Sequence, residues 1–141
     1  MDAEGLMEIH RRAILCAAGD ESALLDAIRD KGTLDHIVEK AEKAQDPLGR
    51  ALEYMRLIAI WHPFFEGNKR TAYLAAQAAL GDRVIDGDPA ELDRLVRLIA
   101  QGSMDADAMR EEFERRLEPC EGDPVDAAIR GQWKLLRRLS L

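Results

Sequence analysis

Apolar residues recur at three- and four-residue intervals along most of the chain, and this spacing predicts a series of amphipathic helices. Three aspartate–proline pairs mark helix starts, because a proline in the first helical turn gives up no needed hydrogen-bond donor. A glycine or a proline marks the expected end of several helices. The predicted helices cover about Ala3–Ala18, Glu21–Asp30, Pro47–His62, Asn68–Leu80, Pro89–Gln101, Met104–Glu118 and Pro124–Arg138 or beyond.

The segment Thr33–Gln45 has an ambiguous pattern. Its apolar residues fit a helix, whereas Thr33–Val38 alone also fits a short strand. Elsewhere Ala, Leu, Glu and Arg dominate, and runs of β-branched or aromatic residues are nearly missing. We therefore predict an all-α fold of about six to eight helices. Its centre is a buried helix pair around a polar loop that begins at His62.

The length of 141 residues favours one compact core. The only weak boundary is the segment Pro119–Asp123, so we expect a domain over residues 1–118 and a C-terminal helical extension over 119–141 that packs on the same domain. The extension carries a locally basic face, made of Arg130, Lys134, Arg137 and Arg138. Its simplest interpretation is a solvated helix that packs through Ile129, Trp133 and Leu136.

With 20 Lys+Arg against 27 Asp+Glu, the formal net charge is −7. Such a chain repels polyanions at long range, which excludes a general nucleic-acid binder. No apolar run reaches the roughly 20 residues of a membrane span, and the acidic start Met1–Glu4 is unlike a secretory signal. We expect a cytoplasmic protein without nucleic-acid or membrane partners. Cys16 and Cys120 are predicted to be reduced, structural residues of helical stretches.

The segment His62–Ala72 is polar and lies between the two most apolar predicted helices. Lys69 and Arg70 stand at a helix N-terminus, where the macrodipole disfavours cations, so we expect a bound anion there. An ammonium and a guanidinium beside free amides suit a polyphosphate. Gly67 lets the backbone approach the anion closely and adopt the positive φ of a turn.

Glu66 is one residue from the predicted phosphate site. A carboxylate beside phosphates is repelled unless a hard cation bridges them, so we predict Mg²⁺ at Glu66. His62 lies on the other side of the loop, and imidazole accepts a proton readily near neutral pH. The implied chemistry is transfer of a phosphorus group from a Mg-nucleotide to a hydroxyl, with His62 as base and Lys69, Arg70 and the helix amides stabilising the developing charge.

Each of these residues also has an ordinary structural interpretation. His62 alone is a helix end, Gly67 a turn and Asn68 a helix cap. His10 and His36 are expected to be ordinary surface or core histidines. Structural support of the loop is expected from Pro63, Phe64 and Thr71, with Phe64 buried. The combination within nine residues is what favours a site.

The segment His62–Arg70 resembles the signature of the Fic/Doc family, His-x-Phe-x-(Asp/Glu)-(Gly/Ala)-Asn-(Gly/Lys)-Arg, at every defined position. Weaker resemblances at Glu21–Arg29 and Gly81–Ile85 extend it over about Leu6–Leu117. The resemblance implies a small α-helical Fic fold whose loop and following helix bind a nucleotide. The roles it implies are the base for His62, Mg²⁺ binding for Glu66, and phosphate binding for Asn68 and Arg70.

Two positions distinguish branches of the family. In AMP-transferring Fic proteins a Gly stands at the position of Lys69 and a second Arg at that of Tyr73, so the resemblance points to the Doc, or death-on-curing, branch. That branch is known for a kinase-type toxin that phosphorylates a translation elongation factor and is neutralised by a small antitoxin. The family's self-inhibiting motif is not found in this sequence, so restraint is expected from another chain.

The resemblance also implies a flap that aligns the target segment by strand addition, for which Thr33–Val38 is the expected place. The sequence thus predicts a toxin-type enzyme that transfers a phosphate from a Mg-nucleoside triphosphate, ATP, to a Ser or Thr hydroxyl of a cytoplasmic protein. Two alternatives stay open. One is protein AMPylation, and the other is a catalytically idle nucleotide-binding module.

Overall fold

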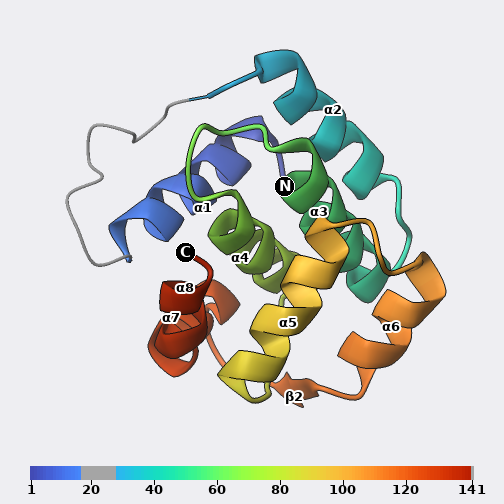
Figure 1. The fold of residues 1–141 in the computed structure, drawn as a ribbon, viewed down its shortest axis with the longest axis vertical. Helices are drawn as coiled ribbons and strands as arrows, with labels where there is room; N and C mark the ends of the chain where they lie inside the picture. Colours follow the sequence, from blue (N-terminus) through green and yellow to red (C-terminus); the bar gives the residue numbers. More distant parts are fainter. Residues whose placement is uncertain (17–27, 141) are drawn as a thin grey trace.

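The computed structural model describes residues 1–16 and 28–140, which form eight helices and one small antiparallel sheet (Figure 1). The all-α prediction is confirmed. In chain order the elements are α1 (Ala3–Leu15), α2 (Lys31–Glu42), α3 (Pro47–Trp61), α4 (Asn68–Leu80), β1 (Arg83–Ile85), α5 (Pro89–Ala100), α6 (Ala106–Glu114), β2 (Leu117–Pro119), α7 (Pro124–Gly131) and α8 (Trp133–Arg138).

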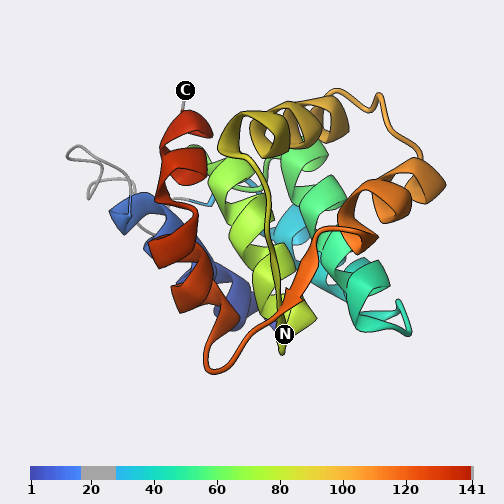
Figure 2. The same cartoon turned by 90° about the horizontal axis from the view of Figure 1, so that it is seen from below.

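Helix α4 lies at the centre of the molecule, with α1, α3, α5 and α7 packed around it (Figures 1 and 2). Its body from Ala72 to Ala76 has no exposed surface. Alanine side chains in this stretch let neighbouring helices approach closely, and α3 makes the most extensive contact. The expected central helix pair is therefore α3 and α4, and the loop between them is the predicted site segment.

The helix starts agree closely with the sequence. Pro47, Pro89 and Pro124 each occupy the first turn of a helix. The aspartates before α5 and α7, and Asp105 before α6, accept hydrogen bonds from first-turn amides, whereas Asp46 makes no such cap bond. These signals are local, which is why the sequence reveals them.

The N-terminal predictions need two corrections. Thr33–Val38 lies inside α2, so an extended flap at this place is wrong; the Asp30 side chain accepts a hydrogen bond from the Thr33 amide and starts the helix. The predicted helix Glu21–Asp30 falls mostly outside the described residues. Its last part is not helical, because Ile28 pairs with Phe64 in an isolated antiparallel bridge. The predicted end of the first helix beyond Cys16 is also outside the described residues.

The C-terminal predictions differ in three ways. The helix expected to reach Glu118 ends at Glu114, and β2 follows, pairing with β1 so that Arg83 lies opposite Pro119. Cys120 consequently lies beyond a strand instead of in a helix. The last predicted helix is broken at Gln132 into α7 and α8. Helix α7 packs on α4 and α8 packs on α5. Among the described residues, no helix is both long and apolar enough to cross a bilayer.

Candidate active site at the start of α4

His62 ends α3 in a left-handed conformation, with φ 49° and ψ 64°. Its amide donates to the Ile58 carbonyl at 3.1 Å, which closes the last helical turn. Pro63 follows, and a proline disfavours the right-handed helical conformation at the residue before it. The chain therefore leaves α3 sharply at His62, and the imidazole is exposed.

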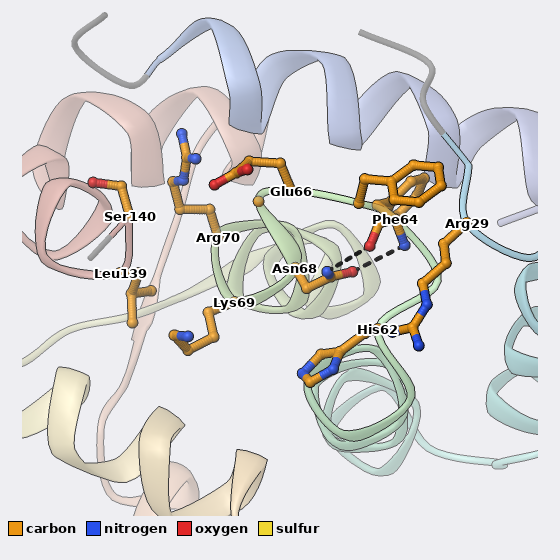
Figure 3. A pocket seen from close by; sticks show the side chains of 11 residues that line it. Arg29, His62, Phe64, Glu66, Asn68, Lys69, Arg70, Leu139 and Ser140 are labelled. Atoms are coloured by element: carbon orange, nitrogen blue, oxygen red, sulfur yellow. Dashed lines mark hydrogen bonds between the residues drawn. The ribbon is translucent and has the colours of Figure 1, made fainter. Parts of the chain in front are cut away.

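A side-chain clamp closes the loop that follows. The Asn68 side-chain amide donates to the Phe64 carbonyl at 2.8 Å, and the Asn68 Oδ1 accepts from the Phe64 amide at 3.1 Å (Figure 3). The prediction that Asn68 is a helix cap is wrong, because the cap position is Gly67 and Asn68 is the first helical residue. The side chain of Asn68 holds the loop, since both of its polar atoms bind Phe64 backbone.

Gly67 has the positive φ that the sequence predicts, at 75°. A Cβ at this position would lie 2.8 Å from the Ile14 Cδ1 atom of α1, and the Gly67 backbone also lines the cavity described below. Gly67 is thus required both by the turn and by the packing of α1 over the loop.

His10 of α1 packs against the loop and holds it in place, a role that was not predicted from the sequence. It is 1% exposed, its ring stacks on Phe64 with a centroid distance of 3.8 Å, and its Nε2–H donates to the Glu66 carbonyl at 3.0 Å. Phe64 is 1% exposed, as expected. The Phe64 ring and the Glu66 backbone are therefore fixed from α1, while the Glu66 carboxylate is exposed.

The side chains of this loop and of the first turn of α4 line a cavity of about 390 Å³ (Figure 3). Its walls contain three cationic side chains and one carboxylate, in a chain whose net charge is −7. The first turn of α4 contains no acidic residue. The lining residues are Arg29, His62, Phe64, Phe65, Glu66, Gly67, Asn68, Lys69, Arg70, Leu139 and Ser140.

Arg70 forms part of the cavity wall and is only 1% exposed. Its side chain points toward α1, and its Nη1 donates to the Ala13 carbonyl at 2.8 Å. The guanidinium is thereby fixed in place between α4 and α1. Lys69, by contrast, is half-buried and lines the cavity.

Neither Glu66 nor Lys69 takes part in an ion pair with another described residue. No group of three or more metal-ligating side chains occurs within residues 1–16 and 28–140. A hard cation at Glu66 would thus need further oxygen ligands from a phosphate, which is the usual arrangement for Mg²⁺ with nucleotides. The exposed carboxylate fits that requirement.

Arg29 reaches the cavity from outside the motif, and it was not among the site residues predicted from the sequence. Its amide donates to the Pro63 carbonyl at 2.8 Å, and the bridge between Ile28 and Phe64 holds the same segment along the loop. The Arg29 guanidinium lies beside His62 (Figure 3). It is exposed and has no carboxylate partner among the described residues.

The end of α8 lines the opposite side of the cavity, through Leu139 and Ser140. This contact joins parts of the chain about seventy residues apart, so the periodicity of the sequence did not indicate it. Thr71 follows Arg70 in α4 and is fully buried. Its hydroxyl has no hydrogen-bond partner within the described part of the chain. Thr71 accordingly contributes packing and no side-chain cap.

Comparisons with known proteins agree with this picture. The model of the Fic/DOC family matches residues 1–80, which include α1, α3, the loop and all of α4. No curated protein matches the chain. The matched region ends where α4 ends, so it contains every cavity residue except Leu139 and Ser140.

Proposed function

The chain belongs to the Fic/DOC family, whose members generally transfer nucleotide or phosphate groups to proteins, and from that premise we propose that it is a Doc-like phosphotransferase. In the proposed reaction the γ-phosphate of a Mg-bound nucleoside triphosphate, ATP, moves to a Ser or Thr hydroxyl of a cytoplasmic protein. A translation elongation factor is the proposed type of target. The observation that carries the proposal is the cationic cavity at the N-terminus of α4, with His62 and Glu66 on its rim.

The charges of the cavity support a polyphosphate ligand. The helix amides and Lys69 face the same space, and the Arg70 guanidinium is held at its wall by the Ala13 carbonyl. A group fixed before the ligand arrives loses little entropy on binding, and each charge-assisted hydrogen bond to phosphate contributes about 1.5–3 kcal/mol. Arg29 adds positive charge on the side of His62.

The surroundings of Tyr73 support phosphate transfer over AMP transfer. This position holds a second Arg in AMP-transferring relatives. Here the Tyr73 side chain is fully buried and donates to the Ile85 carbonyl at 3.3 Å, so it does not line the cavity. Lys69 occupies the position that is Gly in those relatives, and its side chain takes up space at the cavity wall. Both features favour a nucleotide placed with its terminal phosphate at the helix start.

Mg²⁺ held by Glu66 and the phosphates would neutralise charge on the transferred group. The rest of the work falls to residues of the chain. Lys69, Arg70 and the first-turn amides of α4 hold the terminal phosphate in line with the incoming hydroxyl. The clamp between Asn68 and Phe64 keeps this turn in the required geometry.

His62 provides the base. Its exposed imidazole accepts the proton of the target hydroxyl as the hydroxyl oxygen bonds to the γ-phosphorus. The bond between that phosphorus and the β,γ-bridging oxygen breaks, and the leaving nucleoside diphosphate takes up the electron pair. The products are a phosphorylated protein, a nucleoside diphosphate and one proton that His62 returns to solvent.

Paired labelling separates the possible reactions. The purified chain is incubated with Mg²⁺, a cytoplasmic extract and ATP labelled on either the γ- or the α-phosphate. We expect the γ label, and not the α label, to reach a protein beyond those labelled by the extract alone, and we expect a His62→Asn variant to transfer the γ label about 10²–10⁴-fold more slowly. Transfer of the α label would indicate AMPylation, and no transfer with intact nucleotide binding would indicate an idle module.

The proposal includes restraint by a second protein, a small antitoxin, because the sequence lacks the self-inhibiting motif of the family. Expression of the chain alone is expected to slow cell growth, and expression of the Lys69→Glu variant is expected to slow it less. Equal growth of cells with either form and of cells without the chain would count against the toxin role.

A further inference from the structure

Helix α8 has two chemically different faces. Leu135, Leu136 and Leu139 point inward and are at most 3% exposed, and they anchor the helix in the core. The outer face carries Trp133, whose side chain is 50% exposed. A single exposed apolar residue is common on protein surfaces, so the meaning of this one depends on its neighbours.

Those neighbours are cations. The Lys134 Nζ lies 5.6 Å and the Arg137 Cζ 6.0 Å from the Trp133 ring centroid, which is the range of cation–π contacts. Neither cation forms an ion pair within the described part of the chain, whereas the adjacent Arg138 pairs with Asp93 at 3.3 Å. Residues 127–141 contain no acidic residue and four basic ones, Arg130, Lys134, Arg137 and Arg138.

A groove runs between this face and the start of α5. It has a volume of about 470 Å³, and its floor on the α5 side is formed by the segment Asp88–Ala90. The Asp88 carboxylate accepts the Glu91 amide at 3.2 Å and so acts as a helix cap. The groove therefore offers a ligand an aromatic ring, a proline and two basic side chains, Lys134 and Arg137, that form no ion pair within the described part of the chain, beside Arg138, which pairs with Asp93. We call it the Trp133 groove, and it is lined by Asp88, Pro89, Ala90, Trp133, Lys134, Arg137 and Arg138.

We propose that the Trp133 groove docks an acidic segment of a partner protein. Carboxylates of the segment pair with Lys134 and Arg137, and its apolar side chains pack on Trp133 and Pro89. The proposal follows from charge complementarity, because this is a basic surface on a chain of net charge −7.

The charge of the whole chain favours a short acidic peptide over a nucleic acid. The net charge of −7 opposes the approach of a long polyanion. A short acidic segment needs only the local cations.

The position of the groove connects it to the candidate active site. Leu139 and Ser140, directly after α8, line the cavity at the start of α4, so one short helix carries the groove on its outer side and ends at that cavity. Under the proposed function, a partner docked on α8 lies next to the transfer site. Only this position relative to the transfer site rests on the proposed function. Docking itself does not depend on that function.

The test uses the whole chain and fluorescence anisotropy. The probe is a fluorescein-labelled peptide that alternates Glu-Glu with Leu-Phe pairs, without nucleotide, at low salt. We expect saturable binding that weakens as salt is added, and about tenfold or greater weakening in Trp133→Ala and in the double variant Lys134→Glu/Arg137→Glu. All three side chains are exposed, so the fold should persist, and circular dichroism checks it.

The chain supplies a matched control at its second tryptophan. Trp61 is 36% exposed, with the Lys40 Nζ 5.6 Å from its ring centroid, but α2 around it also carries acidic residues. The double variant Trp61→Ala/Lys40→Glu should bind the peptide like the unmodified chain. Absence of peptide binding, equal binding by the Lys134/Arg137 variant, or tighter binding of a labelled oligothymidylate would each overturn the proposal. Because no nucleotide is present, failure here is independent of failure of the proposed transferase reaction.

Discussion

At the scale of single residues, the backbone of His62 connects stability to chemistry. Among the described residues it is the only one other than glycine with a positive φ. Such a conformation costs about 1 kcal/mol or more for most side chains, and strained residues of this kind cluster at functional sites. Here the strain is consistent with placing an imidazole at the cavity rim.

Replacement of His62 by asparagine should separate the two roles. Asparagine tolerates the left-handed conformation, so we expect the free energy of unfolding of His62→Asn to stay within about 0.5 kcal/mol of the unmodified chain. Transfer should fall by about 10²–10⁴-fold, because the base is lost. Thermal unfolding and label transfer measure the two effects. Full transfer activity in a folded His62→Asn protein would exclude His62 as the base.

Arg29 yields a second prediction at this scale. Its guanidinium lies beside His62 and is exposed, so Arg29→Gln should leave stability unchanged and lower kcat/KM for transfer by about tenfold, the loss of one charge-assisted contact. Arg94→Gln is the matched control, since Arg94 is an exposed cation that does not line the cavity. Equal effects of the two substitutions would mean that Arg29 acts only through the overall charge.

At the scale of elements, a partly buried hydrogen bond joins α2 to α3. The Tyr54 hydroxyl donates to the Glu42 carboxylate at 2.6 Å. Burial opposes ionisation of Glu42, but the hydrogen bond from Tyr54 helps to outweigh it and the pKa of Glu42 is lowered. Burial, together with this carboxylate, raises the pKa of the Tyr54 hydroxyl, which therefore stays protonated as a donor.

This contact predicts a pH-dependent stability difference. Because the pKa of Glu42 is lower in the folded than in the unfolded chain, its ionisation stabilises the fold at pH values above the unfolded-state pKa of about 4.3. This stabilisation is lost as the pH falls through the folded-state pKa of Glu42. Tyr54→Phe should lower the free energy of unfolding by about 1 kcal/mol at neutral pH. This value is kept small because Glu42 is partly exposed to solvent, which screens the interaction. The difference in unfolding free energy between the variant and the unmodified chain should shrink in acid. Urea unfolding at several pH values checks it. A difference that grows toward low pH would contradict the assignment.

The elements also explain what the sequence could predict. Local signals such as the prolines at the starts of α3, α5 and α7 were sufficient for those helices. The short sheet was missed, because its stability comes from tertiary contacts. The Gln77 side chain of α4 accepts from the Ile85 amide at 2.8 Å, and β1 pairs with a strand more than thirty residues away. Neither contact produces a regular spacing of apolar residues in the sequence.

The residues of the site also fall into a group that could be predicted from the sequence and a group that could not. The motif residues from His62 to Arg70 could be predicted to lie together, since they are contiguous and start a helix. The contributions of His10, Arg29 and Ser140 could not, because each reaches the loop from another part of the fold. The structural contacts of Asn68 with the Phe64 backbone and of Gly67 with the Ile14 side chain could not be predicted either, because they depend on the folded loop and on α1.

At the scale of the whole molecule, the distribution of charge is uneven. The chain is acidic overall, yet basic side chains gather at the cavity and along the outer face of α8. Leu139 and Ser140, which directly follow α8, line the cavity, and Arg137 and Arg138 of α8 line the Trp133 groove. One is suited to a nucleotide and the other to an acidic protein segment, so a single helix end lies between the two proposed ligands.

The proposed function requires that the start of α4 binds the phosphates of a Mg-nucleotide. Calorimetric titration of the folded chain with Mg²⁺ and a non-hydrolysable ATP analogue measures this binding without any transfer step. We expect one site per chain, retained in His62→Asn and weakened about tenfold or more in Lys69→Glu, with the exposed Arg94→Glu as a charge-matched control that binds normally. No binding to the unmodified chain, or equal binding by the Lys69→Glu and unmodified proteins, would contradict it.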